Sequence, residues 1–235
     1  MPTHHSSSAA LDNPMWHALN GPHRTLAHGA GAVRWYPNTI APFIAIESKD
    51  ARLDLNAALT EGFGEPAYFT GVLPRALTDG WRFISRSNVL QMLPARVEVP
   101  ESRDDDIRVL GAVDRPRMLA LTRIAFPDYF RERTAELGVY LGIFSGAELV
   151  AMAGERLALD GMQEISGVCT HPDHAGRGHA RRLTCALMRR HIERGVDSFL
   201  HVSEGNVAAR RLYESMGFVV RASLPLGKIV REAAF

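Results

Sequence analysis

Two closely spaced glycines, Gly176 and Gly178, interrupt the stretch HPDHAGRGHARRL between a strand-like segment and an arginine-rich helical pattern. Missing side chains let a bound group approach the backbone, and the free N–H groups of a first helical turn attract anions. The stretch therefore predicts a diphosphate-binding turn, with Arg177 and Arg182 as the best candidates for phosphate contacts. No Lys-Ser or Lys-Thr follows, and a three-glycine fingerprint is missing, which argues against an ATPase-type phosphate loop and a dinucleotide site. A plain tight turn into a helix is the alternative.

A second motif, NVAARRLYESMGF, spans residues 206–218. Asn206 stands where a helix cap is expected, and Tyr213 follows almost two helical turns later, so both project from one side of the helix. On pattern alone, a tyrosine in such a helix is more often a packing residue than a catalytic one.

Two carboxylates flank a predicted hairpin turn and are candidates for general-base chemistry. The Asp-Gly pair at residues 160–161 is typical of a two-residue hairpin loop. Pairing outward from that loop places Leu157 opposite Glu164, and residues two apart in a strand share a face. We therefore expect Glu155 and Glu164 on one side of the hairpin, where each could raise the pKa of the other. The alternative is an ion pair of either carboxylate with Arg156 or another arginine.

Cysteine and histidine side chains near the turn allow two further interpretations. Cys169 and His171 lie two residues apart in a predicted strand, where they could form a thiol nucleophile with its base. A lone cysteine in a strand is more often a small buried hydrophobe, so a covalent acyl-enzyme is the minor alternative. His171, His174 and His179 are scattered by the turn and lack a fourth ligand at suitable spacing, so we expect no metal site.

The order of these motifs resembles the acyl-CoA-binding core of the GNAT superfamily of N-acyltransferases, over roughly residues 107–222. In that family the pattern Gln or Arg, two residues, Gly, one residue, Gly or Ala cradles the CoA pyrophosphate. Gly178 and Ala180 match its last two positions, and Ala175 departs from its first. The departure removes one side-chain contact but keeps the amide donors of residues 176–180, so we expect at most weaker binding. The segments LVAMAGER, EISGVCTHP and FLHV look most like the bacterial branch related to glycine N-acyltransferase.

The resemblance also implies roles for single residues. Tyr213 would be the acid that protonates the departing CoA thiolate, and Glu164, Glu155 or water would be the base. Acetyl-CoA or another acyl-CoA would be the cosubstrate, with no metal. The implied cofactor-binding residues are Val168, Cys169, Thr170, Gly176, Arg177, Gly178, His179, Ala180, Arg182 and Asn206.

Composition limits the class of protein. The chain has 235 residues, 46% of them hydrophobic and 23% charged, which is enough to bury a core without metals or disulfides. A formal charge of +1 gives no reason to expect nucleic acid or a membrane surface as a partner. The two cysteines, Cys169 and Cys185, are too few for a disulfide framework. Neither a secretory signal nor a membrane-spanning run is visible, so we expect a cytoplasmic protein.

Hydrophobic patterning predicts the elements that position these motifs. In the second half the expected order is a strand at DIRVLG, a helix capped by Asp114, three strands over residues 138–172, a helix, a strand, a second helix and a closing strand. The first half reads as mixed α/β, with a helix starting at Pro14, and similar lengths of the two halves allow a diverged duplication. Pro100 and the run Asp104, Asp105, Asp106 mark a polar break.

We therefore expect an α/β (α+β) fold with a GNAT-like, mixed but mostly antiparallel sheet flanked by helices. The expected units are a disordered lead-in over 1–10, an N-terminal mixed α/β domain over 11–104 and an acyl-CoA-binding catalytic domain over 105–235. The resemblance implies an N-acetyltransferase that moves an acetyl or other short acyl group to a primary amine by direct attack. The alternative is a non-catalytic acyl-CoA-binding or protein-interaction module. We expect a small-molecule amine rather than a protein as acceptor, and a monomer or homodimer.

Overall fold

The computed structural model describes residues 8–96, 99, 104–125 and 129–232. Its helices are Ser8–Asp12 (α1), Pro14–Asn20 (α2), Leu55–Thr60 (α3), Arg115–Ala125 (α4), His179–Glu193 (α5) and Val207–Ser215 (α6). Its strands are Val33–Trp35 (β1), Ile44–Ile46 (β2), Ala67–Thr70 (β3), Trp81–Pro94 (β4), Ile107–Val109 (β5), Tyr140–Ser145 (β6), Glu148–Leu159 (β7), Met162–Thr170 (β8), Asp197–Ser203 (β9) and Phe218–Arg231 (β10). Short 3-10 helices lie at Ala112–Asp114, Thr134–Leu137 and Pro172–His174.

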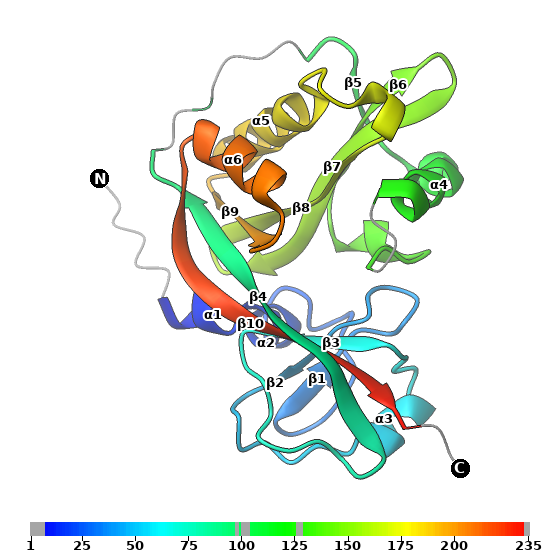
Figure 1. The fold of residues 1–235 in the computed structure, drawn as a ribbon, viewed down its shortest axis with the longest axis vertical. Helices are drawn as coiled ribbons and strands as arrows, with labels where there is room; N and C mark the ends of the chain where they lie inside the picture. Colours follow the sequence, from blue (N-terminus) through cyan, green and yellow to red (C-terminus); the bar gives the residue numbers. More distant parts are fainter. Residues whose placement is uncertain (1–7, 97–98, 100–103, 126–128, 233–235) are drawn as a thin grey trace.

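One sheet of eight strands organises the molecule (Figure 1). Its strand order is β3-β10-β4-β9-β8-β7-β6-β5, and all neighbouring pairs are antiparallel except β8 and β9, which are parallel. Strands β1 and β2 form a separate antiparallel pair near the N-terminal end of the chain. The predicted fold, a mixed and mostly antiparallel sheet flanked by helices, is confirmed.

Helices cover both faces of this sheet. Ala151 and Ala153 of β7 belong to the apolar cluster that includes the buried side of α5. Met152 lies between them and belongs to a different cluster, with residues of α4. Because successive side chains of a strand point to opposite faces, α5 and α4 lie on opposite faces of the sheet. Helix α2 also packs on β7. Within the part of the chain that the structure describes, no helix is long and apolar enough to cross a membrane.

The first half of the chain contributes directly to the large sheet. Strands β3 and β4 precede the predicted domain boundary, yet β4 lies between β10 and β9. The first half also contains an apolar cluster built mainly around four aromatic side chains, Trp35, Phe63, Phe69 and Trp81. Residues 100–103 of the predicted boundary lie outside the described residues, and the division into 11–104 and 105–235 stays a prediction.

The beginning of the chain departs in part from expectation. Residues 8–10 belong to α1 rather than to the predicted lead-in, whose residues 1–7 lie outside the described part of the chain. Helix α2 starts at Pro14, as predicted, but Asn13 does not cap it with its side chain. The Asn13 amide instead donates a hydrogen bond to the carbonyl of Ile46 at 2.8 Å, which ties α2 to β2.

Close packing of β6 against β7 requires a glycine at residue 154. Gly154 pairs with Tyr140, and a Cβ at Gly154 would lie 2.3 Å from atoms of the buried Tyr140 ring. We expect Gly154→Ala to lower the free energy of unfolding by about 1–3 kcal/mol, because the ring has to shift out of a well-packed place. Urea unfolding followed by circular dichroism measures this change.

Gly111→Ala is the matched control. A Cβ at Gly111 meets no atom within 4 Å, and its φ of −113° suits any residue. Its effect should stay within about 0.5 kcal/mol. Equal effects of the two substitutions would contradict this account of the β6–β7 contact.

Candidate active site

A gap in strand pairing lies between β8 and β9. Their parallel pairing ends at Ile165 and Leu200. In the described residues β8 then continues to Thr170 and β9 to Ser203 without pairing to each other. Gly167, whose φ is +60°, lies in an irregular part of the β7–β8 register. We call the space between these unpaired parts the slot; the edge of β8 along it carries part of the predicted cofactor-binding stretch, Val168, Cys169 and Thr170.

The glycine turn follows directly after the slot. A short 3-10 helix at Pro172–His174 leads into Gly176 and Gly178, which have φ values of +74° and +77°. Gly178 is the residue before α5, so the N–H groups of His179 and Ala180 lie in the first turn of the helix. A Cβ on either glycine would meet no atom within 4 Å, which means that open space lies in front of this backbone. The predicted strand, turn and helix are confirmed, and the diphosphate role of the turn stays a prediction.

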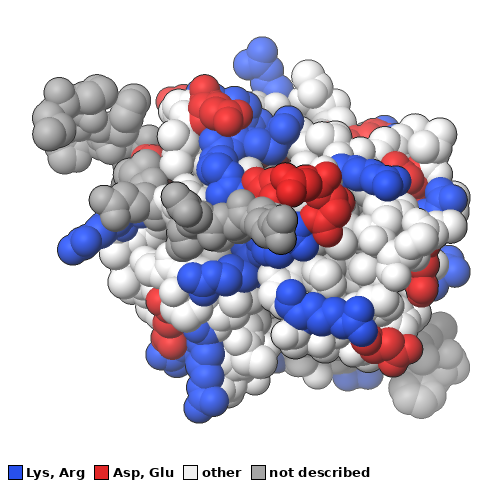
Figure 2. All heavy atoms as spheres, turned by 90° about the horizontal axis from the view of Figure 1, so that it is seen from above, with Lys and Arg blue, Asp and Glu red and all other residues white. Residues whose placement is uncertain are grey.

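Arginines near the turn already have partners. Arg182 forms an ion pair with Asp106, and this contact lowers the pKa of the Asp106 carboxyl below its usual range. The Arg177 guanidinium donates to the carbonyl of Asp173 at 3.3 Å. Figure 2 looks down on this end of the molecule and shows basic and acidic side chains gathered next to each other. Phosphate contacts of Arg182 would therefore compete with Asp106.

The Asn206 and Tyr213 motif forms α6. The Asn206 side chain accepts a hydrogen bond from the Ala209 N–H at 3.1 Å, so the predicted helix cap is confirmed. Tyr213 is buried against Phe218, with 5.9 Å between ring centroids. Burial raises the pKa of Tyr213 to about 12, so its hydroxyl keeps its proton at neutral pH. The apolar cluster that contains Tyr213 also contains Ile165, the last β8 residue that pairs with β9.

The predicted shared face of Glu155 and Glu164 is wrong. Around the turn Leu159 pairs with Met162, as predicted, but further out Glu155 pairs with Ile165. Between these points two residues of β7 oppose the single residue Glu164, which is a β-bulge. Because side chains alternate between the two faces of a sheet, one extra residue in a strand moves every following side chain to the other face. Glu155 therefore points to the α5 face and Glu164 to the opposite face.

Glu155 is enclosed by partners under α5. Its carboxylate accepts hydrogen bonds from Arg194 at 2.5 Å and from the Val139 N–H at 3.0 Å, and lies 3.2 Å from His191 Nε2. Burial acts to raise the pKa of Glu155, but the hydrogen bonds from His191 and Val139 outweigh it and lower the pKa. The expected upward shift is therefore wrong for this carboxyl.

Glu164 lies in a buried ion pair, which is the alternative that the sequence left open. Arg156 donates through Nε to Oε2 at 2.8 Å and through Nη2 to Oε1 at 2.6 Å. The Leu157 N–H also donates to Oε2 at 3.2 Å, and His201 Nδ1 lies 2.8 Å from Oε1. Burial acts to raise the pKa of Glu164, but Arg156 and His201 together lower it to about 2. Glu164 is thus ionised at neutral pH, and the expected upward shift is wrong here too.

The ion pair continues into a chain of polar side chains that no sequence motif indicated. His201 Nε2 lies 3.1 Å from Nε2 of the buried Gln91, whose Oε1 accepts from Arg221 at 2.8 Å. Arg221 in turn forms an ion pair with Asp12 of α1 at 2.7 Å. The chain therefore connects the site to the start of the described protein through side chains from β9, β4 and β10.

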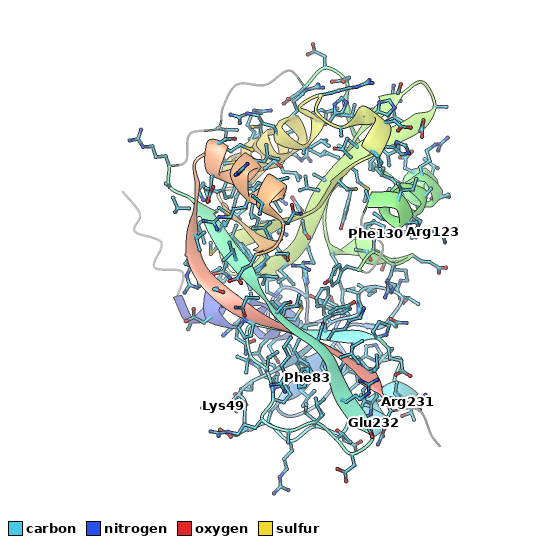
Figure 3. The ribbon with its side chains drawn as sticks, viewed as in Figure 1. Lys49, Phe83, Arg123, Phe130, Arg231 and Glu232 are labelled. Carbon is cyan, nitrogen blue, oxygen red and sulfur yellow. The ribbon has the colours of Figure 1, made fainter. Side chains whose placement is uncertain are left out.

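An aromatic hollow lies beside this ion pair on the α4 face of the sheet. Its lining includes Phe43, Tyr129, Phe130, Tyr140 and Arg156, together with Ser166 and Gly167 of β8. Phe43 and Tyr129 are stacked, with 5.7 Å between centroids, and Phe130 meets Tyr140 edge to face at 5.5 Å. Figure 3 shows the labelled Phe130 next to α4. Because Gly167 lines the hollow and also lies at the edge of the slot, the hollow and the slot meet at Gly167.

Cys169 does not have the surroundings of a nucleophile. It is buried, and burial raises the pKa of its thiol to about 12. His171 Nδ1 accepts a hydrogen bond from the Asp173 N–H at 3.3 Å, so it is not available as the base for that thiol. In residues 8–96, 99, 104–125 and 129–232, no three His, Cys, Asp or Glu side chains gather in a metal-binding arrangement.

Comparison with known proteins agrees with this geometry. Residues 140–224 match the family model described as FR47-like protein. A crystal structure from Novosphingobium aromaticivorans, assigned to the GNAT family of acetyltransferases, is 32% identical in sequence, with a TM-score of 0.84 over 95% of this chain and 99% of that one. The chain belongs to the GNAT family. No protein with a curated description matches it.

More distant GNAT structures share the fold. A GCN5-related N-acetyltransferase from Kribbella flavida is 19% identical, with a TM-score of 0.59 over 90% of this chain and 93% of that one. A GCN5-related N-acetyltransferase-like protein from Streptococcus suis is 14% identical, with a TM-score of 0.54 over 94% of this chain and 96% of that one. None of these matches singles out the glycine N-acyltransferase branch, which stays a prediction.

The Glu164 ion pair generates a pH-dependent prediction. Because folding lowers the pKa of Glu164 from 4.5 to about 2, its ionised form stabilises the protein above pH 4.5, and this stabilisation is lost as the pH falls through about 2. Glu164→Gln leaves Arg156 buried without its counter-charge, so we expect it to cost about 3–5 kcal/mol at pH 7. The difference from wild type should shrink between pH 4.5 and 2, as measured by urea unfolding across that range.

Glu193→Gln, at an exposed position near the end of α5, is the control and should change stability by less than about 0.5 kcal/mol. A wild-type advantage over Glu164→Gln that stays constant down to pH 2 would contradict the assignment of Glu164 as an ionised structural partner.

Proposed function

We propose that this GNAT protein transfers an acetyl or other short acyl group from acyl-CoA to a primary amine, by direct attack in a ternary complex. The observation that carries the proposal is the slot between β8 and β9 together with the glycine turn that follows it at the start of α5. The pantetheine arm of CoA is an extended chain with amide groups, which can pair with the free backbone groups of the β8 edge. The CoA diphosphate can bind to the N–H groups at the start of α5, in front of which there is open space.

Different residues of the slot and the glycine turn would bind different parts of acyl-CoA. Backbone groups of Val168, Cys169 and Thr170 would pair with the amides of the pantetheine arm. The N–H groups over residues 176–180 would hold the diphosphate, and they remain donors although Ala175 replaces the usual Gln or Arg. Arg177 and Arg182 would add charge next to the phosphates, the latter by exchanging its Asp106 partner.

Tyr213 is proposed as the acid. Its hydroxyl stays protonated because burial raises its pKa to about 12, and its ring belongs to the apolar cluster that also contains Ile165 and Leu200, where the pairing of β8 with β9 ends. In this proposal the hydroxyl would donate its hydrogen to the leaving thiolate sulfur as the amine nitrogen bonds to the acyl carbon. A hydrogen-bond donor that faces the sulfur stabilises the negative charge that develops there in the transition state, and this lowers the activation barrier.

The amine's proton is assigned to water. Glu155 and Glu164 were the candidate bases, but each carboxylate already accepts from an arginine and from a backbone N–H. A carboxylate whose pKa is lowered in this way is a weak base near neutral pH. We therefore propose that the acceptor attacks as the neutral amine and loses its proton to water after attack.

A non-catalytic acyl-CoA-binding module is the second candidate. Two observations favour it: Ala175 in place of the family's usual side-chain contact, and the engagement of both carboxylates in ion pairs. This reading predicts acyl-CoA binding without release of thiol in the presence of any amine, so a binding assay and a turnover assay together separate the two candidates.

The first test is a calorimetric titration with acetyl-CoA, and with CoA, ATP and NADPH as controls. We expect saturable binding of acetyl-CoA and CoA only, because only these offer both a pantetheine arm and a diphosphate. Thiol release in a panel of amines then decides between transferase and binding module. Equal binding of ATP or NADPH, or binding of none of the four, would contradict the assignment of the slot.

Tyr213→Phe tests the acid. Loss of the hydroxyl should lower turnover by about a hundredfold or more, because the thiolate then leaves without a proton donor. The dissociation constant for acetyl-CoA, measured by calorimetry, should stay close to the wild-type value. Ser215→Ala is the control, since it removes an exposed hydroxyl on the same helix that donates to the Leu212 carbonyl at 2.7 Å, and it should leave turnover nearly unchanged. Wild-type turnover in Tyr213→Phe would remove Tyr213 from this role.

A further inference from the structure

The Asp106 carboxylate lies at the start of α5, where the acyl-CoA diphosphate is proposed to bind. Arg182 belongs to the first turns of α5, and its guanidinium donates through both Nη atoms to the two carboxylate oxygens of Asp106, with 3.2 Å between Nη1 and Oδ2. Two parallel hydrogen bonds are the strong arrangement for an arginine and a carboxylate. The Asp106 side chain is 52% exposed. The pair is therefore at the surface, where a ligand can reach it.

The charge of Asp106 also reaches the first residue of α5. Burial and the Arg182 charge lower the pKa of the His179 imidazole, and the Asp106 carboxylate acts against them. Phosphate groups bound to the N–H groups of residues 176–180 would therefore feel the charge of this carboxylate as well. Like charges repel each other, and at a half-exposed position water and salt weaken this repulsion without abolishing it.

The neighbouring charged residues differ from this pair. Arg181 donates to the Ser215 hydroxyl at 3.0 Å and Arg177 to a backbone carbonyl at 3.3 Å, so these hydrogen bonds go to neutral groups. Asp105 is exposed, and it forms no ion pair among the residues that the structure describes. The basic and acidic side chains that meet at this end of the molecule are visible in Figure 2. Asp105 and Asp106 therefore carry the same charge, but only the latter binds Arg182 in this way.

An internal carboxylate in this place weakens the binding of every phosphate ligand. Each ligand has to share Arg182 with Asp106 or displace Asp106, whatever else the ligand contacts. Acetyl-CoA can offset this loss through its pantetheine arm, whose amides can pair with the β8 edge. A nucleotide without that arm lacks those contacts, so the same loss of binding free energy keeps its affinity low.

We propose that Asp106 is a specificity-determining residue, which weakens the binding of all phosphate ligands at the start of α5 so that only ligands with a pantetheine arm bind well. The proposal rests on the proposed binding of acyl-CoA and adds the reason why free nucleotides do not occupy the site. Asp106 acts on ligand binding and takes no part in the transfer of the acyl group.

The test is a calorimetric titration of wild type and Asp106→Asn with acetyl-CoA, ADP and S-acetylpantetheine. ADP has the diphosphate without the arm, and S-acetylpantetheine has the arm without phosphate. We expect Asp106→Asn to lower the Kd of acetyl-CoA by about fivefold to twentyfold, because a like charge beside the diphosphate is removed. ADP should gain by a similar factor, which makes its weak binding measurable. Binding of S-acetylpantetheine should be the same in both proteins.

Asp105→Asn is the matched control, since it makes the same change in net charge one residue away. It should change the Kd of acetyl-CoA and of ADP by no more than about twofold, because an exposed charge without a partner is screened by water and salt. Thermal unfolding reports whether each variant is folded. Asp106→Asn should be, because an ion pair exposed to this degree contributes little to stability. If it is not, Asp106→Ser takes its place, and loss of folding in both would overturn the proposal.

Failure of this proposal differs from failure of the proposed function. If wild type binds acetyl-CoA but Asp106→Asn binds it no more tightly, only the role of Asp106 is overturned. An equal gain in Asp105→Asn, or an equal gain for S-acetylpantetheine, would overturn it too. If wild type binds no acetyl-CoA, the proposed function fails, and ADP then decides. Binding of ADP to Asp106→Asn but not to wild type or Asp105→Asn would support the proposal, and no binding to Asp106→Asn would overturn it.

Discussion

The parallel pairing of β8 with β9 ends at Ile165 and Leu200, although both strands continue. Beyond that point the backbone groups on this edge of β8 have no partner in β9 among the described residues, so they are open to another extended chain or to water. The position of the interruption also fixes its neighbours. The glycine turn and α5 follow from the end of β8, and α6 follows from the end of β9, so both helices begin where the two strands no longer pair. The slot and the starts of α5 and α6 thus lie together at one break in the sheet.

The bulge opposite Glu164 is the second constraint, because it divides the polar groups of the site between two faces. Glu155 is directed to α5, where His191 and Arg194 enclose it. Glu164 is directed to the hollow, where it holds Arg156. A buried ion pair is weak evidence for stability, since desolvation offsets most of the Coulomb attraction.

The sequence was sufficient where the determining interactions are local. The Asp160-Gly161 loop, the cap at Asn206 and the glycine turn before α5 each depend on a few neighbouring residues, and the structure contains all three. The face of Glu155 was not predictable, because one bulged residue reverses the alternation and leaves no mark in the pattern. The polar chain through His201 was equally hidden, since Gln91 lies 110 residues away in sequence. Membership of β3 and β4 in the large sheet likewise depends on pairing with β10, at the far end of the chain.

Backbone amide hydrogen exchange with and without acetyl-CoA tests the central claim most directly, because the claim concerns backbone groups. The account predicts that acetyl-CoA slows exchange of two segments above all others, residues 168–170 on the free edge of β8 and residues 176–180 at the start of α5. Neither segment should respond to ATP at the same concentration. Protection confined to other parts of the chain, or unchanged exchange in both segments under saturating acetyl-CoA, would contradict the account.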